Sequence, residues 1–375
     1  MDKKFYEMSR QERLDHLKEV TGVTDIESML QPIPFESANR MVENAIGSIT
    51  MPMGIATNFV INGRELLIPM AIEEPSVIAA ASKAAKIAKA TGGFSAQADE
   101  SLMIGQVQVV GISSLKAAAA KIRKNKKRIL AAANEKSKSV VAKGLQVRAL
   151  RDSSPNKMGN MLVVELVVNT MDAMGANVIN TMCEAIAPIV AELTGGEVVL
   201  KILSNYATKR LVKCKAIFSE NEIGGPDVVG RILYAYALAH SDVYRAVTHN
   251  KGVMNGIDAI ALATGQDFRA IEAGAHAYAA RDGQYRSLTR WRRTRQGDLE
   301  GQIEIPLAVG IVGGITTTHP AVKLALQIMG VTSVKDLAMA MACAGLAQNF
   351  AAIRALSDEG IQQGHMRLHA RKFSK

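Results

Sequence analysis

The sequence predicts an α+β fold in which a small domain is inserted into a larger one. Residues 103–204 alternate between strand and helix patterns in the order β-α-β-β-α-β, which is the split arrangement of ferredoxin-like domains. The chain on either side is mostly helical, and 375 residues are long for one domain. We therefore assign residues 1–102 and 205–363 to a large, mostly helical, discontinuous domain and residues 103–204 to a small domain.

The first part of the large domain begins with helical patterns and continues into a hairpin. Residues 10–31 and 36–47 have helical patterns, whereas residues 54–61 and 65–70 have strand patterns. Asn62-Gly63 between the two strands is a strong two-residue hairpin signal. Proline is favoured in the first turn of a helix, so the Ala- and Lys-rich run that follows predicts a helix from Pro75, with Glu74 at its N-terminus.

We expect the small domain to contain strands at residues 103–112, 145–150, 161–169 and 197–203 and helices at 115–134 and 175–193. After residue 204 we expect strands at 209–218 and 303–309 and helices at 226–240, 258–265 and 269–280. The longest apolar helical run, residues 337–347, is too short to cross a bilayer and predicts a buried helix.

Composition and charge narrow the possible functions. The net charge of +10 favours a polyanionic partner, which is a nucleic acid, a membrane surface or a phosphate-rich small molecule. Cys183, Cys214 and Cys343 have neither metal-site nor disulfide spacing, so we expect no metal. The charged N-terminus lacks the apolar stretch of a signal peptide, which predicts a cytoplasmic protein.

The segment from Asp172 to Asn177 lies between a buried strand and a helix. Backbone N–H groups at the start of a helix bind phosphate, and Gly175 lets a ligand approach closely. The segment is not GxGxxG, so a dinucleotide site here would not be of Rossmann type. An ordinary strand-to-helix turn capped by Asp172 is the alternative.

Two further segments carry charged residues suited to carbonyl chemistry. The adjacent carboxylates of Glu73 and Glu74 precede a predicted helix, where the helix dipole alone would also explain them. Residues 249–256 contain Gly, Asn and Lys and predict an anion-binding loop in which Lys251 would face an oxyanion. Arg245, just upstream of this loop, could bind a carboxylate. A polar surface loop is the alternative.

Asp267, His365 and a basic helix complete the candidate features. Asp267 follows an apolar segment and is either a helix cap or a partner for a lysine. His365 and His369 would share a helix face, but no Glu stands between them as in HExxH, so a single general-acid histidine is favoured over a metal pair. The basic residues of 116–143 indicate a solvated helix face, a phosphate site or nucleic-acid binding.

Together and in this order, these segments resemble the class II 3-hydroxy-3-methylglutaryl-coenzyme A (HMG-CoA) reductases. The resemblance runs from about residue 10 to the end, through ENAIG, EEPS, DAMGANVINTM, YRAVTHNKGVMNGID, ATGQD, VGGITTTHP and EGIQQGHMRLHAR. It implies an oxidoreductase that interconverts HMG-CoA with mevalonate and CoA by two hydride transfers from NADPH or NADH. This reaction serves the mevalonate pathway of isoprenoid biosynthesis or mevalonate degradation.

The resemblance also implies roles for individual residues. The catalytic positions are Glu74, Lys251, Asp267 and His365, and the positions around the HMG group are Arg245, Ser76 and Asn255. The cofactor positions are Asp172, Met174, Gly175, Ala176, Asn177, Asn180, Thr181 and Ser137. The family forms homodimers, and higher oligomers are possible. Its active site lies at the subunit interface, so we expect Glu74 from one subunit and Lys251 with Asp267 from the other.

Two features depart from the family pattern. NADH-dependent members carry an acidic residue where this chain has Ser137 between Lys136 and Lys138, so we expect NADPH to be preferred. Residues 364–375 would be only the start of a C-terminal flap that is otherwise absent. A different nicotinamide-linked reductase and a nucleic-acid-binding module remain as alternatives, although we expect neither nucleic acid nor a membrane as partner.

Overall fold

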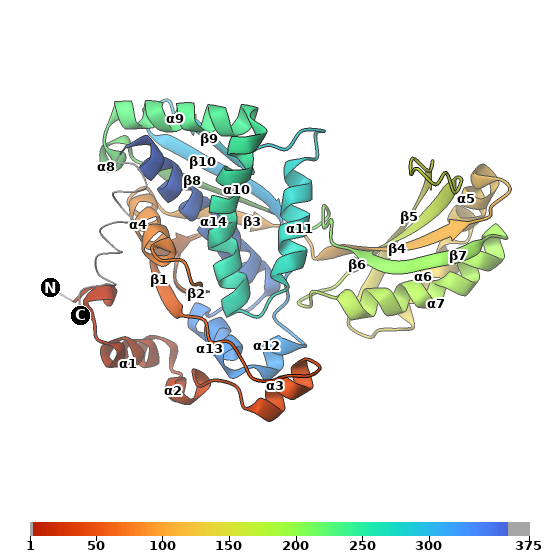
Figure 1. The fold of residues 1–375 in the computed structure, drawn as a ribbon, viewed down its shortest axis with the longest axis horizontal. Coiled ribbons are helices and arrows are strands. Elements are labelled where there is room, and N and C mark those ends of the chain that lie inside the picture. Colours follow the sequence, from red (N-terminus) through yellow and green to blue (C-terminus); the bar gives the residue numbers. More distant parts are fainter. Residues whose placement is uncertain (1–2, 359–375) are drawn as a thin grey trace. The chain divides into compact units, whose positions relative to one another are not determined.

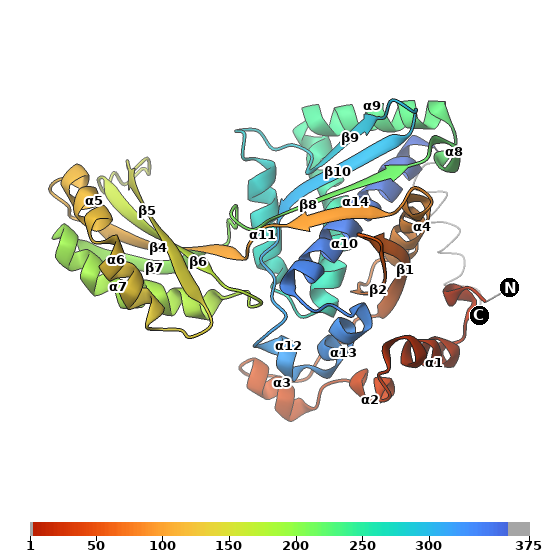
Figure 2. The same ribbon diagram turned by 180° about the vertical axis from the view of Figure 1, so that it is seen from behind.

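The computed structural model describes residues 3–358, which form two compact units (Figures 1 and 2). Within the described residues, unit 1 comprises 3–98, 212–305 and 311–358, and unit 2 comprises 99–211 and 306–310. Unit 2 therefore extends a few residues beyond both ends of the small domain expected at 103–204, and it also includes a short segment from later in the chain. We describe each unit separately.

Unit 1 is built on a six-stranded sheet with the order β2-β1-β3-β8-β10-β9. The strands are β1 (Met53–Ile61), β2 (Arg64–Ala71), β3 (Phe94–Ala98), β8 (Leu211–Phe218), β9 (Thr289–Arg293) and β10 (Leu299–Pro306). The hairpin β1–β2 is confirmed, and Asn62 and Gly63 at its turn both have positive φ, as a type I′ turn requires. The expectation of a mostly helical large domain missed β3 and β9, which are only five residues long.

Helices surround this sheet and form the rest of unit 1. The longer ones are α1 (Arg10–Thr21), α4 (Val77–Lys89), α9 (Pro226–Ser241), α10 (Val243–Ala263), α11 (Phe268–Ala279), α13 (Pro320–Met329) and α14 (Val334–Ser357). Shorter ones are η1 (Phe5–Glu7), α2 (Ile26–Met29), α3 (Phe35–Met41), α8 (Glu220–Ile223) and α12 (Ile315–Thr318). α14 is long and apolar enough to span a membrane by length and composition. However, 78% of its most apolar stretch of 18 residues is buried inside the protein, which is typical of a core helix.

Residues 249–256 lie in the middle of α10, so the prediction of an anion-binding loop there was wrong. One of their two glycines, Gly256, serves helix packing instead. A Cβ at Gly256 would lie 2.6 Å from the carbonyl oxygen of Ala344 on α14, and a Cβ at Gly345 would lie 2.9 Å from Ile257 on α10. The backbones of α10 and α14 therefore approach each other closely through two glycines, one on each helix (Figure 1).

Unit 2 contains a four-stranded antiparallel sheet with the order β5-β6-β4-β7. The strands are β4 (Leu102–Val110), β5 (Val141–Leu150), β6 (Met161–Asn169) and β7 (Glu197–Ser204), and the helices are α5 (Leu115–Lys124), α6 (Lys126–Asn134) and α7 (Ala176–Thr194). The expected helix at 115–134 is interrupted at Asn125, which lies outside the helical region between α5 and α6. With two sheets and many helices, the α+β class is confirmed.

The glycines of α10 provide a matched pair of substitutions. We expect Gly256→Ala to destabilise the fold by about 1–3 kcal/mol, because its Cβ would press on the backbone of α14. Gly252→Ala has its nearest neighbour at 3.8 Å and should be neutral or slightly stabilising, because alanine favours helices over glycine. Urea unfolding of both variants measures the difference, and equal midpoints would contradict the close-packing argument.

Candidate active site

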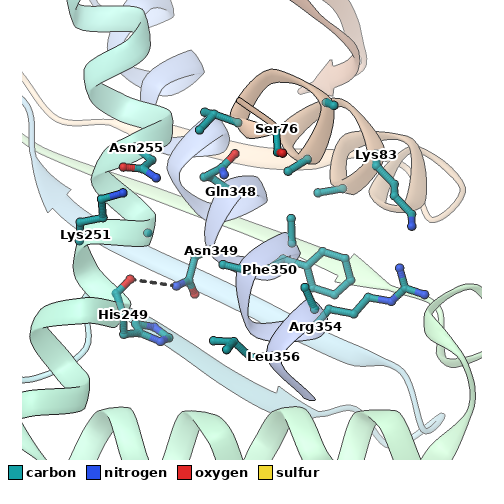
Figure 3. A pocket seen from close by; sticks show the side chains of 18 of the residues that line it. Ser76, Lys83, His249, Lys251, Asn255, Gln348, Asn349, Phe350, Arg354 and Leu356 are labelled. Carbon is teal, nitrogen blue, oxygen red and sulfur yellow. Dashed lines mark hydrogen bonds between the residues drawn. The ribbon is translucent and has the colours of Figure 1, made fainter. Parts of the chain in front are cut away.

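A cavity of about 500 Å³ lies in unit 1 between α4, α10 and α14 (Figure 3). Its volume is within the range of small-molecule sites. Charged and polar side chains from all three elements line it, among them Glu74, Ser76, Lys83, Arg245, His249, Lys251, Asn255, Gln348, Asn349 and Arg354. The structure thus brings together the sequence candidates Glu74, Ser76, Arg245, Lys251 and Asn255.

The central interaction of this cavity is an ion pair between Glu74 and Lys251. The ammonium of Lys251 donates a hydrogen bond to Oε2 of Glu74 at 2.7 Å, and Nδ2 of Asn255 lies 3.4 Å from the same oxygen. Lys251 and Asn255 are four residues apart on α10 and therefore share a helix face. The pair forms within one chain, so the expectation that different subunits supply Glu74 and Lys251 was wrong.

Ser76 occupies a strained position beside this pair. It has φ +79°, which is uncommon for a residue with a Cβ, and it precedes α4, which begins at Val77 rather than at Pro75. Its Oγ is buried and has no hydrogen-bond partner among the described residues. A buried hydroxyl without a partner at the wall of a cavity indicates a contact that a ligand completes.

His249 is a neutral histidine in the cavity wall. Its Nε2 lies 2.7 Å from Oγ1 of Thr289, and Thr289 donates its own hydroxyl hydrogen to Oδ1 of Asn349 at 2.9 Å. The proton between His249 and Thr289 therefore belongs to Nε2. Burial, together with the nearby charge of Arg245, lowers the pKa of His249 to about 3, so the ring stays uncharged at neutral pH.

Sequence analysis missed the contributions of His249, Gln348 and Asn349 to this cavity. Gln348 and Asn349 follow directly after the apolar run 337–347, and both are buried. The sequence signal for these two residues was a pair of amides that interrupts an otherwise apolar buried helix, because buried amides need hydrogen-bond partners. Asn349 has them in Thr289, Trp291 and the carbonyl of His249, whereas Oε1 of Gln348 has none among the described residues.

Asp267 is not brought into the cavity of its own chain. It caps α11, where it accepts a hydrogen bond from the N–H of Ala270 at 3.1 Å and pairs with Arg269. Lys251 lies 12 residues (263 − 251) before the end of α10 at Ala263. That length of helix corresponds to about 18 Å, so Asp267 and Lys251 of one chain lie far apart. His365 lies outside the described residues.

A hydrogen-bonded network of titratable groups joins α10 to α11 near this site. Burial raises the pKa of Asp258 to about 9, and Glu272 also raises it by hydrogen bonding and by its charge. Glu272 contacts Nε2 of His276 at 2.6 Å, and His276 contacts the hydroxyl of Tyr285 at 2.7 Å. Hydrogen bonding to His276 is the main cause that lowers the pKa of Glu272. At neutral pH, Asp258 is therefore the protonated carboxyl of the pair.

The cofactor candidates lie in unit 2, mostly around the start of α7. Asp172 and Met174 precede α7, Gly175 caps it with φ +92°, and Ala176 and Asn177 form its first turn. Oδ1 of Asn180 accepts the N–H of Leu203, and Thr181 donates to the carbonyl of Asn177. Ser137 lies in the turn after α6, where its Oγ accepts the N–H groups of Ser139 and Val140. Residues 3–358 contain no cluster of three or more His, Cys, Asp or Glu suited to a metal.

Known proteins are similar to this chain in sequence and in fold. Residues 9–370 match the family model described as hydroxymethylglutaryl-coenzyme A reductase. The chain is 50% identical to 3-hydroxy-3-methylglutaryl-coenzyme A reductase of Archaeoglobus fulgidus over 99% of this chain and 86% of that protein. A Streptococcus pneumoniae class II enzyme, solved bound to NADPH in open conformations, matches with TM-score 0.89 and 38% identity over 94% of this chain and 98% of that chain.

Asp258 predicts a pH dependence of stability. Its folded-state pKa of about 9 exceeds its ordinary value of 3.8, so the folded protein holds a proton that the unfolded chain releases, and this contribution is lost as the pH rises between those values. Asp258→Asn has no such proton. We expect its Tm, relative to that of the parent chain, to rise by about 3 °C between about pH 5 and about pH 8.

Asp152→Asn is the control for this measurement. Hydrogen bonds, first of all from the backbone of Ser154, lower the pKa of Asp152, so its titration lies below this pH range in both folded and unfolded states. Its Tm difference from the parent chain should therefore be constant. A constant difference for Asp258→Asn as well would contradict the protonated state of Asp258.

Proposed function

This chain belongs to the hydroxymethylglutaryl-coenzyme A reductase family, and we propose that the cavity between α4, α10 and α14 binds the HMG group of HMG-CoA. The chain is an NAD(P)H-dependent oxidoreductase of class II type, which interconverts HMG-CoA with mevalonate and CoA. The observation that carries the proposal is the Glu74–Lys251 ion pair in the wall of a cavity of about 500 Å³. An ammonium held by a carboxylate is suited to a carbonyl that becomes an oxyanion.

We assign the chemical steps to this pair. As the thioester carbon is reduced, negative charge builds on its oxygen, and the ammonium of Lys251 stabilises that charge. The hemithioacetal then breaks its C–S bond to give mevaldehyde and the CoA thiolate, which His365 protonates. In the second reduction, Lys251 transfers a proton to the alkoxide of mevalonate, and a protonated Glu74 replaces that proton across their 2.7 Å contact, which leaves Glu74 as the carboxylate of the ion pair. The same site catalyses both synthesis and degradation of mevalonate, because each step is reversible.

Three further side chains bind the HMG group. The half-buried guanidinium of Arg245 pairs with the free carboxylate of HMG, because arginine binds carboxylates through two parallel hydrogen bonds. The Oγ of Ser76, which lacks a partner among the described residues, supplies another hydrogen bond. Asn255 stands beside Glu74 and orients it.

Unit 2 is the cofactor domain in this proposal, and we describe it as an inserted ferredoxin-like domain. Its strand order β5-β6-β4-β7 and its helices between β4 and β5 and between β6 and β7 support this description. The N-terminus of α7 fits a dinucleotide pyrophosphate, because its free N–H groups and the helix dipole favour anions. NAD(P)H, when bound, supplies the hydrides for both reductions. No metal takes part.

We propose a homodimer with the active site at its interface, located in the cytoplasm. About 18 Å of helix separates Lys251 from the end of α10 at Ala263, four residues before Asp267. We therefore infer that Asp267 reaches Lys251 from a second copy. Exposed apolar side chains on the neighbouring helices α9 and α10 support such an interface, namely Tyr234, Leu238, Val243, Tyr244 and Val247.

Mixing two inactive variants tests this arrangement. We expect Lys251→Ala and Asp267→Ala to be inactive alone, both with HMG-CoA and with mevaldehyde. When the two are unfolded and refolded together, half of the dimers combine one subunit of each kind, and one of the two sites in these dimers has both Lys251 and Asp267. The mixture should regain about a quarter of the parent activity, measured as cofactor oxidation at about 340 nm.

The controls separate the possible explanations. Lys251→Ala mixed with Glu74→Ala should stay inactive, because these residues act within one chain and each mixed site keeps a defect. Recovery in that mixture, or none in the first, would contradict the proposed division between subunits. Full activity of Lys251→Ala alone would contradict its catalytic role.

Cofactor preference depends on Ser137 and its lysine neighbours. We expect NADPH to be preferred over NADH, and we expect Ser137→Asp to raise KM for NADPH at least about tenfold, because the carboxylate repels the 2′-phosphate. KM for NADH should change little. Ser137→Asn is the matched control, since its side chain has nearly the size of Asp and can accept the same turn N–H groups without adding charge. An equal rise in both variants, or a parent enzyme that prefers NADH, would contradict the assignment.

A further inference from the structure

We propose that Arg210 positions the loop of residues 170–175, on which the cofactor binds. The inference rests on the proposed function of this loop as part of the nicotinamide nucleotide site. Arg210 precedes β8 in unit 2 and is only 4% exposed. A charged side chain is rarely buried so deeply unless its hydrogen bonds hold something in place.

The guanidinium of Arg210 bridges two segments that are distant in sequence. Its Nη1 donates to Oγ1 of Thr170 at 3.3 Å and to the carbonyl of Ala173 at 3.4 Å, and its Nη2 donates to the carbonyl of Val309 at 2.5 Å. The backbone carbonyl of Arg210 also accepts the N–H of Leu307 at 3.2 Å. Arg210 therefore ties the loop to the segment 306–310.

The loop needs such support because its backbone is strained and closely packed. Met171 has φ +54°, an uncommon conformation for a residue with a Cβ. A Cβ at Gly175 would lie 2.3 Å from Cγ2 of Thr170, and a Cβ at Gly310 would lie 2.5 Å from the backbone nitrogen of Met174. Small shifts of the segment 306–310 would therefore displace the loop.

Arg210 also places a positive charge against the loop that leads into α7. Burial lowers its pKa to about 10, while the negative charge of Asp172 acts in the opposite direction. The guanidinium is thus fully charged at neutral pH. It adds to the positive end of the α7 dipole, where an anionic pyrophosphate would lie. Lysine cannot replace it, because one ammonium cannot reach three acceptors with the geometry of the planar guanidinium.

The experiment measures cofactor binding in the full chain. In fluorescence titrations with NADPH, we expect Arg210→Lys to raise Kd about tenfold, as loss of one or two charge-assisted hydrogen bonds predicts. KM for NADPH should rise in parallel, while KM for HMG-CoA stays within about twofold of the parent value. Thr170→Val keeps the side-chain shape but removes one acceptor of Arg210, so it should raise Kd about threefold. This milder variant provides the test if Arg210→Lys does not fold.

Two further variants make the outcome decisive. Glu165 is buried in the same unit and binds Arg148 and Gln106, so Glu165→Gln should lower Tm without changing Kd for NADPH. If Glu165→Gln raises Kd for NADPH as much as Arg210→Lys does, the effect of Arg210→Lys is explained by general destabilisation of unit 2. That result would overturn the proposal. Gly175→Ala alters the loop directly, because its Cβ collides with Thr170.

If Gly175→Ala weakens NADPH binding but Arg210→Lys and Thr170→Val do not, the loop binds the cofactor and the role of Arg210 is refuted. If none of the three changes Kd, the loop is not the cofactor site, and the proposed function of this segment is refuted with it. Weaker binding in all three, with Glu165→Gln unchanged, supports the positioning role.

Discussion

The close approach of α10 and α14 is the constraint on which the cavity depends. Gly256 and Gly345 bring the two backbones together, with less than 3 Å between each added Cβ and the facing helix. Because both helices are rigid, this contact fixes Lys251 and Asn255 on one wall and Gln348 and Asn349 on the other. α4 then completes the cavity and brings Glu74 to Lys251. Close helix packing thus gives the proposed catalytic side chains a precision that a loop would not provide.

Some interactions in the wall of the cavity stabilise the fold, whereas others are suited to a role in the reaction. The buried hydrogen bonds among His249, Thr289 and Asn349 are fully desolvated and hold α10, β9 and α14 together. The Glu74–Lys251 pair is different, since the two side chains are 35% and 59% exposed. Exposed ion pairs stabilise a fold by at most about 1 kcal/mol. The Glu74–Lys251 pair in the wall of the cavity is therefore better explained by a role in the reaction than by a contribution to stability.

The sequence predicted what local patterns determine and failed where tertiary packing decides. The turn at Asn62-Gly63 and the strand–helix order of unit 2 follow from local backbone preferences and periodicity, and the structure has both. Residues 249–256 look like a loop because glycines usually break helices, but here the close approach of α14 requires the glycine at 256. β9 contains three arginines in five residues and is recognisable only beside its partner β10. Glu74 stood out in the sequence as a carboxylate at the start of a predicted helix, and the role of Ser76 came from family resemblance. Their meeting with α10 in one chain depends on tertiary packing that no local pattern shows.

The spacing between Lys251 and Asp267 shows how a helix can make catalysis depend on association. In a flexible segment, a separation of 16 residues (267 − 251) would allow the two side chains to meet in one chain. In α10 most of that length is stiff, and each residue adds about 1.5 Å. The helix therefore carries the lysine of one site and ends near the aspartate that serves the other site of the proposed dimer. In the proposed dimer, each site would be complete only when two copies associate, so catalytic competence and dimer stability would be linked by mass action.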